Sequence, residues 1–253
     1  MNTKSQVSPG IDTVGSWLRS MVAVVGLSLA VGCATVPAGT VNDPYESFNR
    51  SMFSLNEGLD KAVLKPVATL YQAVTPGFVR TAVSNFFANL SEPWVAVNAA
   101  LQLKGQAAAE TVVRFGVNTV FGLGGLLDIA SEMNLERRNE DFGQTLGFWG
   151  ANSGPYLVLP FFGSSTVRDG MGLLVDFQGD PVTQAPNLSN NERTGLSILR
   201  LASFRESLLR AGNLMDEAAL DKYTFTRDVY LQRRQALVLD GQEPPDTLEP
   251  PAK

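Results

Sequence analysis

The stretch "DPYESFNRSMFSLNEGLD", residues 43–60, predicts an amphipathic helix. Asp43 is a candidate N-cap, Pro44 suits the first helical position, and Glu46 completes a capping box. Apolar side chains then recur at helical spacing along one continuous face: Tyr45, Phe48, Met52, Leu55 and Leu59. A helix with this pattern either packs on the core of a soluble protein or lies at a membrane surface, and the pattern alone leaves both open.

The same pattern recurs toward the C-terminus, and strand patterns are scarce. Because Arg114 falls inside a helix that is apolar on most sides, it requires a carboxylate or carbonyl partner. The sequence therefore predicts a mainly α-helical fold. The further helices are expected at residues 75–90 (capped by Thr75), 91–101 (capped by Ser91), 106–121, 164–177, 190–212 and 223–239.

The stretch "GANSGPYLVLPFF", residues 150–162, departs from helical periodicity. Two prolines within eight residues exclude a regular helix and disfavour a central strand. We expect it to be buried, or to meet lipid where its backbone is satisfied. Its first residues suit either a hinge or a tight structural turn: Gly150, Asn152, Gly154 and Pro155. It ends in an apolar segment, namely Pro160, Phe161 and Phe162.

The N-terminus has the pattern of a bacterial lipoprotein signal. An uncharged apolar run of 12 residues, 21–32, precedes Cys33, the only cysteine of the chain. Such a run is too short for a membrane span, which needs about 20 residues. The sequence predicts a signal peptide at 1–32, a lipidated tether at 33–42, one helical domain at 43–240 and a disordered, Pro-rich acidic tail at 241–253. The alternative for Cys33 is a buried cysteine after a hydrophobic helix.

Composition excludes several classes of function. Without residues 1–32, which carry Lys4, Arg19 and Asp12, the chain keeps 18 basic and 24 acidic residues, a net charge of −6 that disfavours nucleic acid. The absence of histidine removes Ser-His-Asp and Cys-His catalysis and histidine metal sites. We therefore expect no enzyme, no cofactor and no metal. A lipase or acyltransferase would have to use serine with lysine or aspartate as its base.

Several segments in the same order are similar to the MlaA/VacJ family of outer-membrane phospholipid-transport lipoproteins. The similar segments, from about Asp43 to Arg234, are "DPYESFNRSMF", "KPVA", "SNFFANLSEPWVAVN", "RFGVNTVFGLGGLLDIA", "DFGQTLGFWGANSGPYLVLPFFGSSTVRD" and "YTFTRDVYLQRR". The resemblance implies an all-α, ring-like bundle of amphipathic helices lying in the outer membrane around an amphipathic channel. It gives no role to residues 170–192.

The resemblance also implies a function without catalysis. Family members remove phospholipids that have strayed into the outer leaflet, pass them to a periplasmic carrier of the MlaC type, and sit beside trimeric porins. It implies a hinge-like channel loop at Gly150–Gly154 and a helix in the membrane plane over Phe48–Asn56. The residues expected on that helix are Phe48, Met52, Phe53, Leu55 and Asn56. The alternative function is a structural envelope lipoprotein that stabilises porins without transport.

The lipoprotein pattern predicts that Cys33→Ala leaves an uncut precursor at the inner membrane, because alanine has no thiol to accept lipid. Mass spectrometry of the membrane-bound protein, together with labelling by a fatty-acid analogue, measures both processing and lipidation. A variant of mature size in the outer membrane would contradict the prediction.

Overall fold

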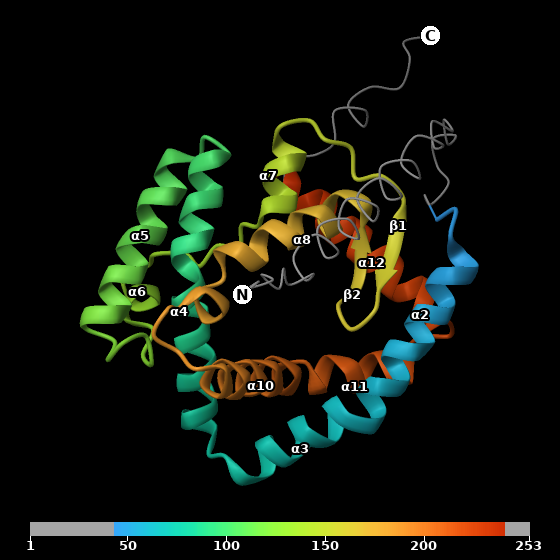
Figure 1. Ribbon diagram of the computed structural model, residues 1–253, viewed down its shortest axis with the longest axis horizontal. Coiled ribbons are helices and arrows are strands. Elements are labelled where there is room, and N and C mark those ends of the chain that lie inside the picture. Colours follow the sequence, from blue (N-terminus) through green and yellow to red (C-terminus); the bar gives the residue numbers. More distant parts are fainter. Residues whose placement is uncertain (1–42, 241–253) are drawn as a thin grey trace, which may run out of the picture. The chain divides into compact units, whose positions relative to one another are not determined.

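The computed structural model describes residues 43–240, so the predicted signal peptide, tether, Cys33 and acidic tail lie outside the described residues. The prediction of an all-α fold is confirmed, with one short hairpin added (Figure 1). The elements are α2 (Glu46–Leu59), the π-helical turn η2 (Asp60–Leu64), α3 (Lys65–Val74), α4 (Gly77–Leu101), α5 (Gly105–Val120), α6 (Ile129–Glu132), α7 (Phe142–Phe148), β1 (Tyr156–Leu159), β2 (Gly163–Thr166), α8 (Val167–Gly179), α9 (Pro181–Gln184), α10 (Asn190–Ser207), α11 (Leu209–Ala218) and α12 (Lys222–Val238).

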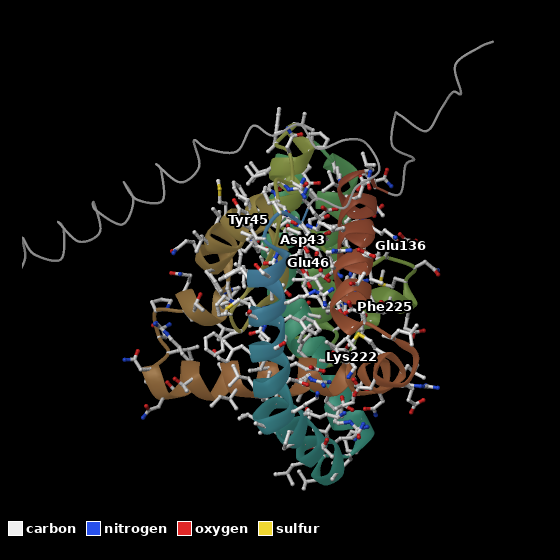
Figure 2. The ribbon with its side chains drawn as sticks, turned by 90° about the vertical axis from the view of Figure 1, so that its right-hand side faces the viewer. Asp43, Tyr45, Glu46, Glu136, Lys222 and Phe225 are labelled. Atoms are coloured by element: carbon white, nitrogen blue, oxygen red, sulfur yellow. The ribbon has the colours of Figure 1, made fainter. Side chains whose placement is uncertain are left out.

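Helix α2 forms where the apolar spacing predicted it, but the predicted cap is wrong. Tyr45 is the N-cap, and its side chain makes no capping bond. Asp43 instead accepts a hydrogen bond from Asn49 Nδ2 at 2.8 Å and pairs with Arg227 at 3.3 Å. The carboxylate of Asp43 therefore joins the start of α2 to α12, where a guanidinium attracts it more strongly than a backbone N–H (Figure 2).

Helix α4 is continuous over Gly77–Leu101, and the prediction of two helices separated at Ser91 is wrong. The predicted cap at Thr75 is also wrong, because Pro76 is the N-cap. Pro93 removes one backbone donor, yet the Ser91 hydroxyl bonds back to the carbonyls of Phe87 and Ala88 at 3.0 Å. Packing along α5 holds both halves of α4 in line across the proline, which local sequence signals do not reveal.

The elements contact one another in a closed circuit. Helix α2 continues into η2 and α3, and α3 packs beside α10 and α11, which run nearly end to end (Figure 1). Helix α10 packs on α4, α4 on α7, and α7 on α8. Helix α8 contacts both strands of the hairpin, and β1 returns to α2. Helix α9 lies between α8 and α10 and contacts both, so residues 181–184 link two sides of the circuit.

A buried guanidinium joins α4, α5 and the segment after α5. Arg114 is 0% exposed, and its Nε lies 3.1 Å from Glu92 Oε1 while its Nη2 lies 3.1 Å from Asp128 Oδ1. It also donates to the Leu135 carbonyl, so the predicted need for carboxylate or carbonyl partners is confirmed. Desolvation raises the pKa of Glu92. At Asp128 desolvation also acts upward, but hydrogen bonds and the charges of nearby arginines prevail and lower its pKa to about 2.

A second polar network joins α7, α8 and α12. Arg234 on α12 pairs with Asp141 at the start of α7 and, at 2.9 Å, with Asp169 on α8. Helices α7 and α8 approach closely: a Cβ added to Gly172 on α8 would lie 2.7 Å from the Cα of Gly143 on α7. Glycine is thus required where the two helices cross, and the ion pairs of Arg234 hold the helices together at that point.

The distribution of polarity is unusual for a water-soluble protein. Among the described residues, 17 buried residues are polar or charged and 13 are hydrophobic. Large apolar side chains are exposed on α2, η2, α3, α4, α5 and α10, including Val74 at 68%, Phe78 at 77% and Phe121 at 71%. Within residues 43–240 no helix combines the length and the apolar character needed to cross a bilayer. Exposed apolar area on this scale indicates a surface that meets lipid or partner proteins.

Replacing Arg114 by methionine should lower the free energy of unfolding by about 3–5 kcal/mol, since Glu92 and Asp128 would lose a buried counter-charge. Denaturant unfolding in mild detergent, followed by circular dichroism, measures the change. Arg210→Met, at an exposed position, is the matched control and should shift stability by less than about 0.5 kcal/mol. Equal stabilities of the two variants would contradict a structural role for the buried network.

Candidate functional site

The hairpin sits at the centre of the candidate site, and α2 holds its free edge. Strands β1 and β2 pair antiparallel with Tyr156 opposite Thr166 and Leu159 opposite Gly163. On the other edge of β1, Asn49 accepts from Val158 N at 2.9 Å and donates to the Tyr156 carbonyl at 3.0 Å. One side-chain amide thus makes the two bonds that a neighbouring strand would make.

Asn56, two turns further along α2, repeats this arrangement at the hairpin tip. Its Nδ2 donates to the Leu159 carbonyl and its Oδ1 accepts from Phe161 N, each at 2.9 Å. Asn49 and Asn56 lie seven residues apart and so share one face of the helix. We call this pair of side chains the amide clamp. It satisfies backbone groups of the apolar stretch. The stretch forms β1 of a two-stranded hairpin, so the predictions that it is neither a regular helix nor a central strand are confirmed.

Only part of the predicted membrane-plane set faces outward. Phe48 and Leu55 are 50% and 46% exposed, whereas Met52 and Phe53 pack against the buried cluster formed by Tyr156, Val158 and Tyr223. Asn56 bonds the hairpin. The helix therefore presents its apolar residues to two sides, and a membrane-facing role stays a prediction for Phe48 and Leu55 alone.

The predicted apolar segment forms the tip of the hairpin. Pro160 is exposed there, Phe161 is 77% exposed and Phe162 is 60% exposed. The ring of Phe162 lies edge-to-face with Phe177 near the end of α8, with ring centroids 5.5 Å apart. The tip thus places two aromatic rings between the helices of the circuit.

A cavity of about 600 Å³ lies on one side of Phe162, between α4, the end of α8, α9 and α10. We call it the hydroxyl cavity because its polar lining is mostly uncharged. Its apolar wall consists of Phe87, Ala88, Phe162, Phe177, Leu201 and Phe204. Its hydroxyl groups come from Ser84, Ser91, Thr183, Ser197, Ser203 and Ser207. The only charges in this lining, Asp180 and Arg200, pair at 2.9 Å.

A second cavity, of about 390 Å³, lies on the other side of Phe162, between α2, η2, α11 and the hairpin tip. We call it the charged cavity. It combines apolar side chains with ionised ones, and its apolar members are Phe53, Leu64, Phe161, Phe162, Leu208 and Met215. Its ionised members are Glu57, Asp60, Lys61, Lys65, Arg205 and Asp216.

Phe162 is common to the linings of both cavities. The two cavities are therefore neighbours on either side of the hairpin tip, one toward α4 and the other toward α2, and the lining of each is amphipathic. A molecule with apolar chains and a polar end matches this lining, because apolar walls take the chains and a few polar groups take the end.

The predicted hinge loop connects α7 to β1 and lines neither of these cavities. Gly150 and Gly154 have φ of +88° and +67°, which L side chains rarely adopt. Arg168 N donates to the Ser153 carbonyl at 3.1 Å, so the loop is bonded to the start of α8. Asn152 is exposed, and Pro155 leads directly into β1. A hinge at this loop stays a prediction.

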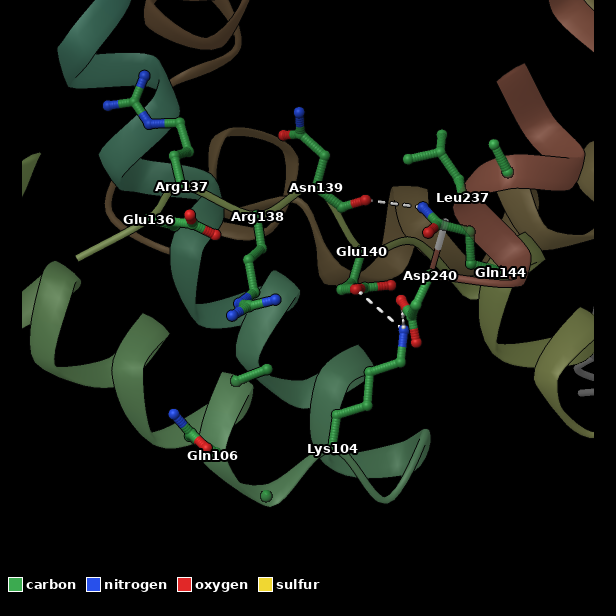
Figure 3. A pocket seen from close by; sticks show the side chains of 13 residues that line it. Lys104, Gln106, Glu136, Arg137, Arg138, Asn139, Glu140, Gln144, Leu237 and Asp240 are labelled. Atoms are coloured by element: carbon green, nitrogen blue, oxygen red, sulfur yellow. Dashed lines mark hydrogen bonds and ion pairs between the residues drawn. The ribbon is translucent and has the colours of Figure 1, made fainter. Parts of the chain in front are cut away.

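A third, polar cavity lies where α5 begins and α12 ends (Figure 3). Lys104 pairs there with Glu140 at 3.2 Å and with Asp240, and Gln144 donates to the Asn139 carbonyl at 2.7 Å. Lys104, Glu140 and Asp240 are thus engaged with each other, whereas Arg137 and Arg138 pair with Asp128 and Glu110 outside the lining. Within residues 43–240 no cluster of carboxylate, cysteine or histidine side chains could hold a metal ion.

Sequence reasoning missed three parts of the site. It assigned no role to Asn49, although a second asparagine seven residues on was a detectable signal for a shared polar face. It left residues 170–192 without a role, and these supply Phe177, Asp180 and Thr183 to the hydroxyl cavity. It did not find the pair of Arg205 with Asp60, because 145 residues separate them.

Comparison with known proteins gives consistent matches over this region. The family described as MlaA lipoprotein matches residues 41–237, which include every residue that lines the two cavities. The intermembrane phospholipid transport system lipoprotein MlaA of Escherichia coli K12 is 35% identical over 237 residues, covering 90% of this chain and 92% of that protein. The protein of the same name from Shigella flexneri is 34% identical over 236 residues, with the same coverage. A solved structure described as the structural basis for maintenance of bacterial outer membrane lipid asymmetry is 34% identical, with a TM-score of 0.66, and the match covers 78% of this chain and 98% of that one.

The amide clamp predicts that Asn56→Leu loosens the hairpin tip, because the Leu159 carbonyl and Phe161 N–H lose their partner. The expected cost is about 1 kcal/mol, at the low end for a lost hydrogen-bond partner, since the site is half-exposed. Hydrogen exchange of the Phe161 amide measures the local effect. Ser54→Leu, on the exposed side of α2, should leave that amide unchanged. Equal exchange in the two variants would contradict the role of the clamp.

Proposed function

Because this chain belongs to the MlaA lipoprotein family, we propose that it is a component of an intermembrane phospholipid transport system and helps to maintain outer-membrane lipid asymmetry. In this role it takes phospholipids from the outer leaflet of the outer membrane and passes them to a periplasmic carrier. The observation that carries the proposal is the pair of amphipathic cavities that share Phe162, and we propose that together they form the lipid path.

The lining of these cavities supports passage better than tight retention. Serine and threonine hydroxyls can exchange hydrogen bonds with a headgroup, and the aromatic and aliphatic wall accepts acyl chains. Transport neither makes nor breaks a covalent bond, so it needs no nucleophile or general base. The proposal therefore treats the protein as a conduit rather than an enzyme.

Residence at the membrane is supported by the exposed apolar side chains and the lipoprotein pattern. Anchoring at Cys33 would bring acyl chains into one leaflet, and side chains such as Phe78 and Phe121 would then enter the lipid from the folded domain. The outer membrane as the location, a carrier of the MlaC type and a trimeric porin as partners are part of the proposal. They rest on the family resemblance.

Within this proposal the loop from Gly150 to Pro155 acts as a hinge for the hairpin. The loop enters β1 directly, so a small change in its backbone would tilt the tip that separates the two cavities. Positive φ at Gly150 and Gly154 gives the loop a conformation that other residues reach at a cost.

Obstruction of the hydroxyl cavity tests the transport role. Ser84→Trp places an indole in that cavity, whereas Thr81→Trp, one turn earlier on α4, lies outside its lining. In cells that lack the wild-type gene, Ser84→Trp should restore lipid asymmetry several-fold less well than Thr81→Trp. A membrane-impermeant amine label with lipid mass spectrometry measures phosphatidylethanolamine in the outer leaflet.

The same experiment separates transport from the alternative structural role. If deletion raises outer-leaflet phospholipid and both tryptophan variants restore it equally, the path through the hydroxyl cavity is wrong. If deletion leaves outer-leaflet phospholipid unchanged but lowers porin levels, a structural lipoprotein is favoured. New lysophospholipid formed by the purified protein would instead indicate an enzyme.

A further inference from the structure

The charged cavity is built around the π-helical turn η2. A π turn adds a residue to the helical repeat and turns the following side chains to a new direction, and such turns are frequent at functional sites. Here it carries Asp60, Lys61 and Leu64 into the lining of one cavity. Three consecutive elements of the chain, α2, η2 and the start of α3, thus contribute ionised groups to the same space.

The ionised groups of this cavity form three pairs of opposite charge. Lys61 lies 3.0 Å from Glu57, and Arg205 lies 2.6 Å from Asp60. Lys65 and Asp216 form the third pair, at 3.5 Å. The lining therefore carries three positive and three negative charges and is neutral as a whole.

The pairs are positioned to exchange partners. Lys61 and Lys65 are 58% and 36% exposed, and ion pairs at this exposure contribute little to stability. Lys222, at the start of α12 (Figure 2), contacts both Glu57 and Asp216, so these two carboxylates already share cations. Arg205 uses Nε and Nη2 for Asp60, and its buried Nη1 has no hydrogen-bond partner within residues 43–240.

We infer that the charged cavity is the headgroup site of the lipid path and that it favours zwitterionic over anionic phospholipids. A phosphate oxygen beside Asp60 would satisfy the free nitrogen of Arg205 and reach Lys61. The ammonium of an ethanolamine headgroup would at the same time replace a lysine on Glu57 or Asp216. A zwitterion thus replaces the cation that it displaces, whereas an anionic glycerol headgroup leaves Glu57 or Asp216 with only the lysine that the two share, Lys222.

This inference rests on the proposed function, and its test uses the full-length, lipidated protein. The protein is incubated with vesicles of equal phosphatidylethanolamine and phosphatidylglycerol, re-purified in mild detergent, and its bound lipids are quantified by mass spectrometry. Glu57→Gln combined with Asp216→Asn makes the lining net positive. The ratio of bound phosphatidylethanolamine to phosphatidylglycerol should then fall about threefold, as expected for the loss of partly exposed ion pairs.

Two further variants keep the result specific. Glu46→Gln combined with Asp228→Asn removes the same number of negative charges as the first cavity variant. These two residues lie on α2 and α12, outside the cavity lining, so the ratio should stay unchanged. Lys61→Gln combined with Lys65→Gln makes the lining net negative and should raise the ratio. Opposite shifts in the two cavity variants cannot come from partial unfolding.

The outcomes separate the inference from the function beneath it. If the wild-type protein retains no phospholipid, the proposed function fails. If it retains phospholipid but both cavity variants give the ratio of the control, the headgroup site is overturned and transport stands.

Discussion

The buried guanidinium of Arg114 is the interaction on which the rest of the fold depends. Its partners lie on α4 and on the segment after α5, so one side chain fixes the relative positions of elements that 22 residues or fewer separate along the chain. Leaving such a charge unpaired would cost several kcal/mol, and the partners therefore have to be present together. Three further polar side chains also connect elements that are distant in the sequence. Asp43, Asn49 and Arg234 each join α2 or α12 to such an element.

This reliance on polar contacts follows from the apolar exterior. In a protein dissolved in water, apolar burial drives folding and polar groups stay outside. Here much of the apolar side-chain surface remains exposed, and the apolar cluster beneath the hairpin contains only Tyr156, Val158 and Tyr223 with a few partly buried neighbours. Specific hydrogen bonds and ion pairs therefore define the arrangement of the helices, while lipid is proposed to cover the outside.

Much of the helical architecture could be predicted from periodicity, because apolar spacing is a local signal. The helices over Glu46–Leu59 and Gly105–Val120, and the need of Arg114 for partners, were all readable from the sequence. The two caps, the continuity of α4 through Pro93 and the amide clamp were not, since each depends on a contact between segments that the linear pattern does not pair. The cavities could not be predicted for the same reason, because each lining draws on at least five elements of the fold. Of the lining residues, the sequence marked only Phe53, Asn56, Phe161 and Phe162 as site residues.

The inverted polarity of the folded domain also has a consequence for its biogenesis. A folded protein with this much exposed apolar surface is prone to aggregate in an aqueous compartment. If the protein is lipidated at one membrane and functions at another, a binding partner has to cover Phe78, Phe121 and similar side chains while it crosses the space between them. If the proposed location holds, the apolar surface that suits the domain to the outer membrane would make its transfer there depend on a chaperone.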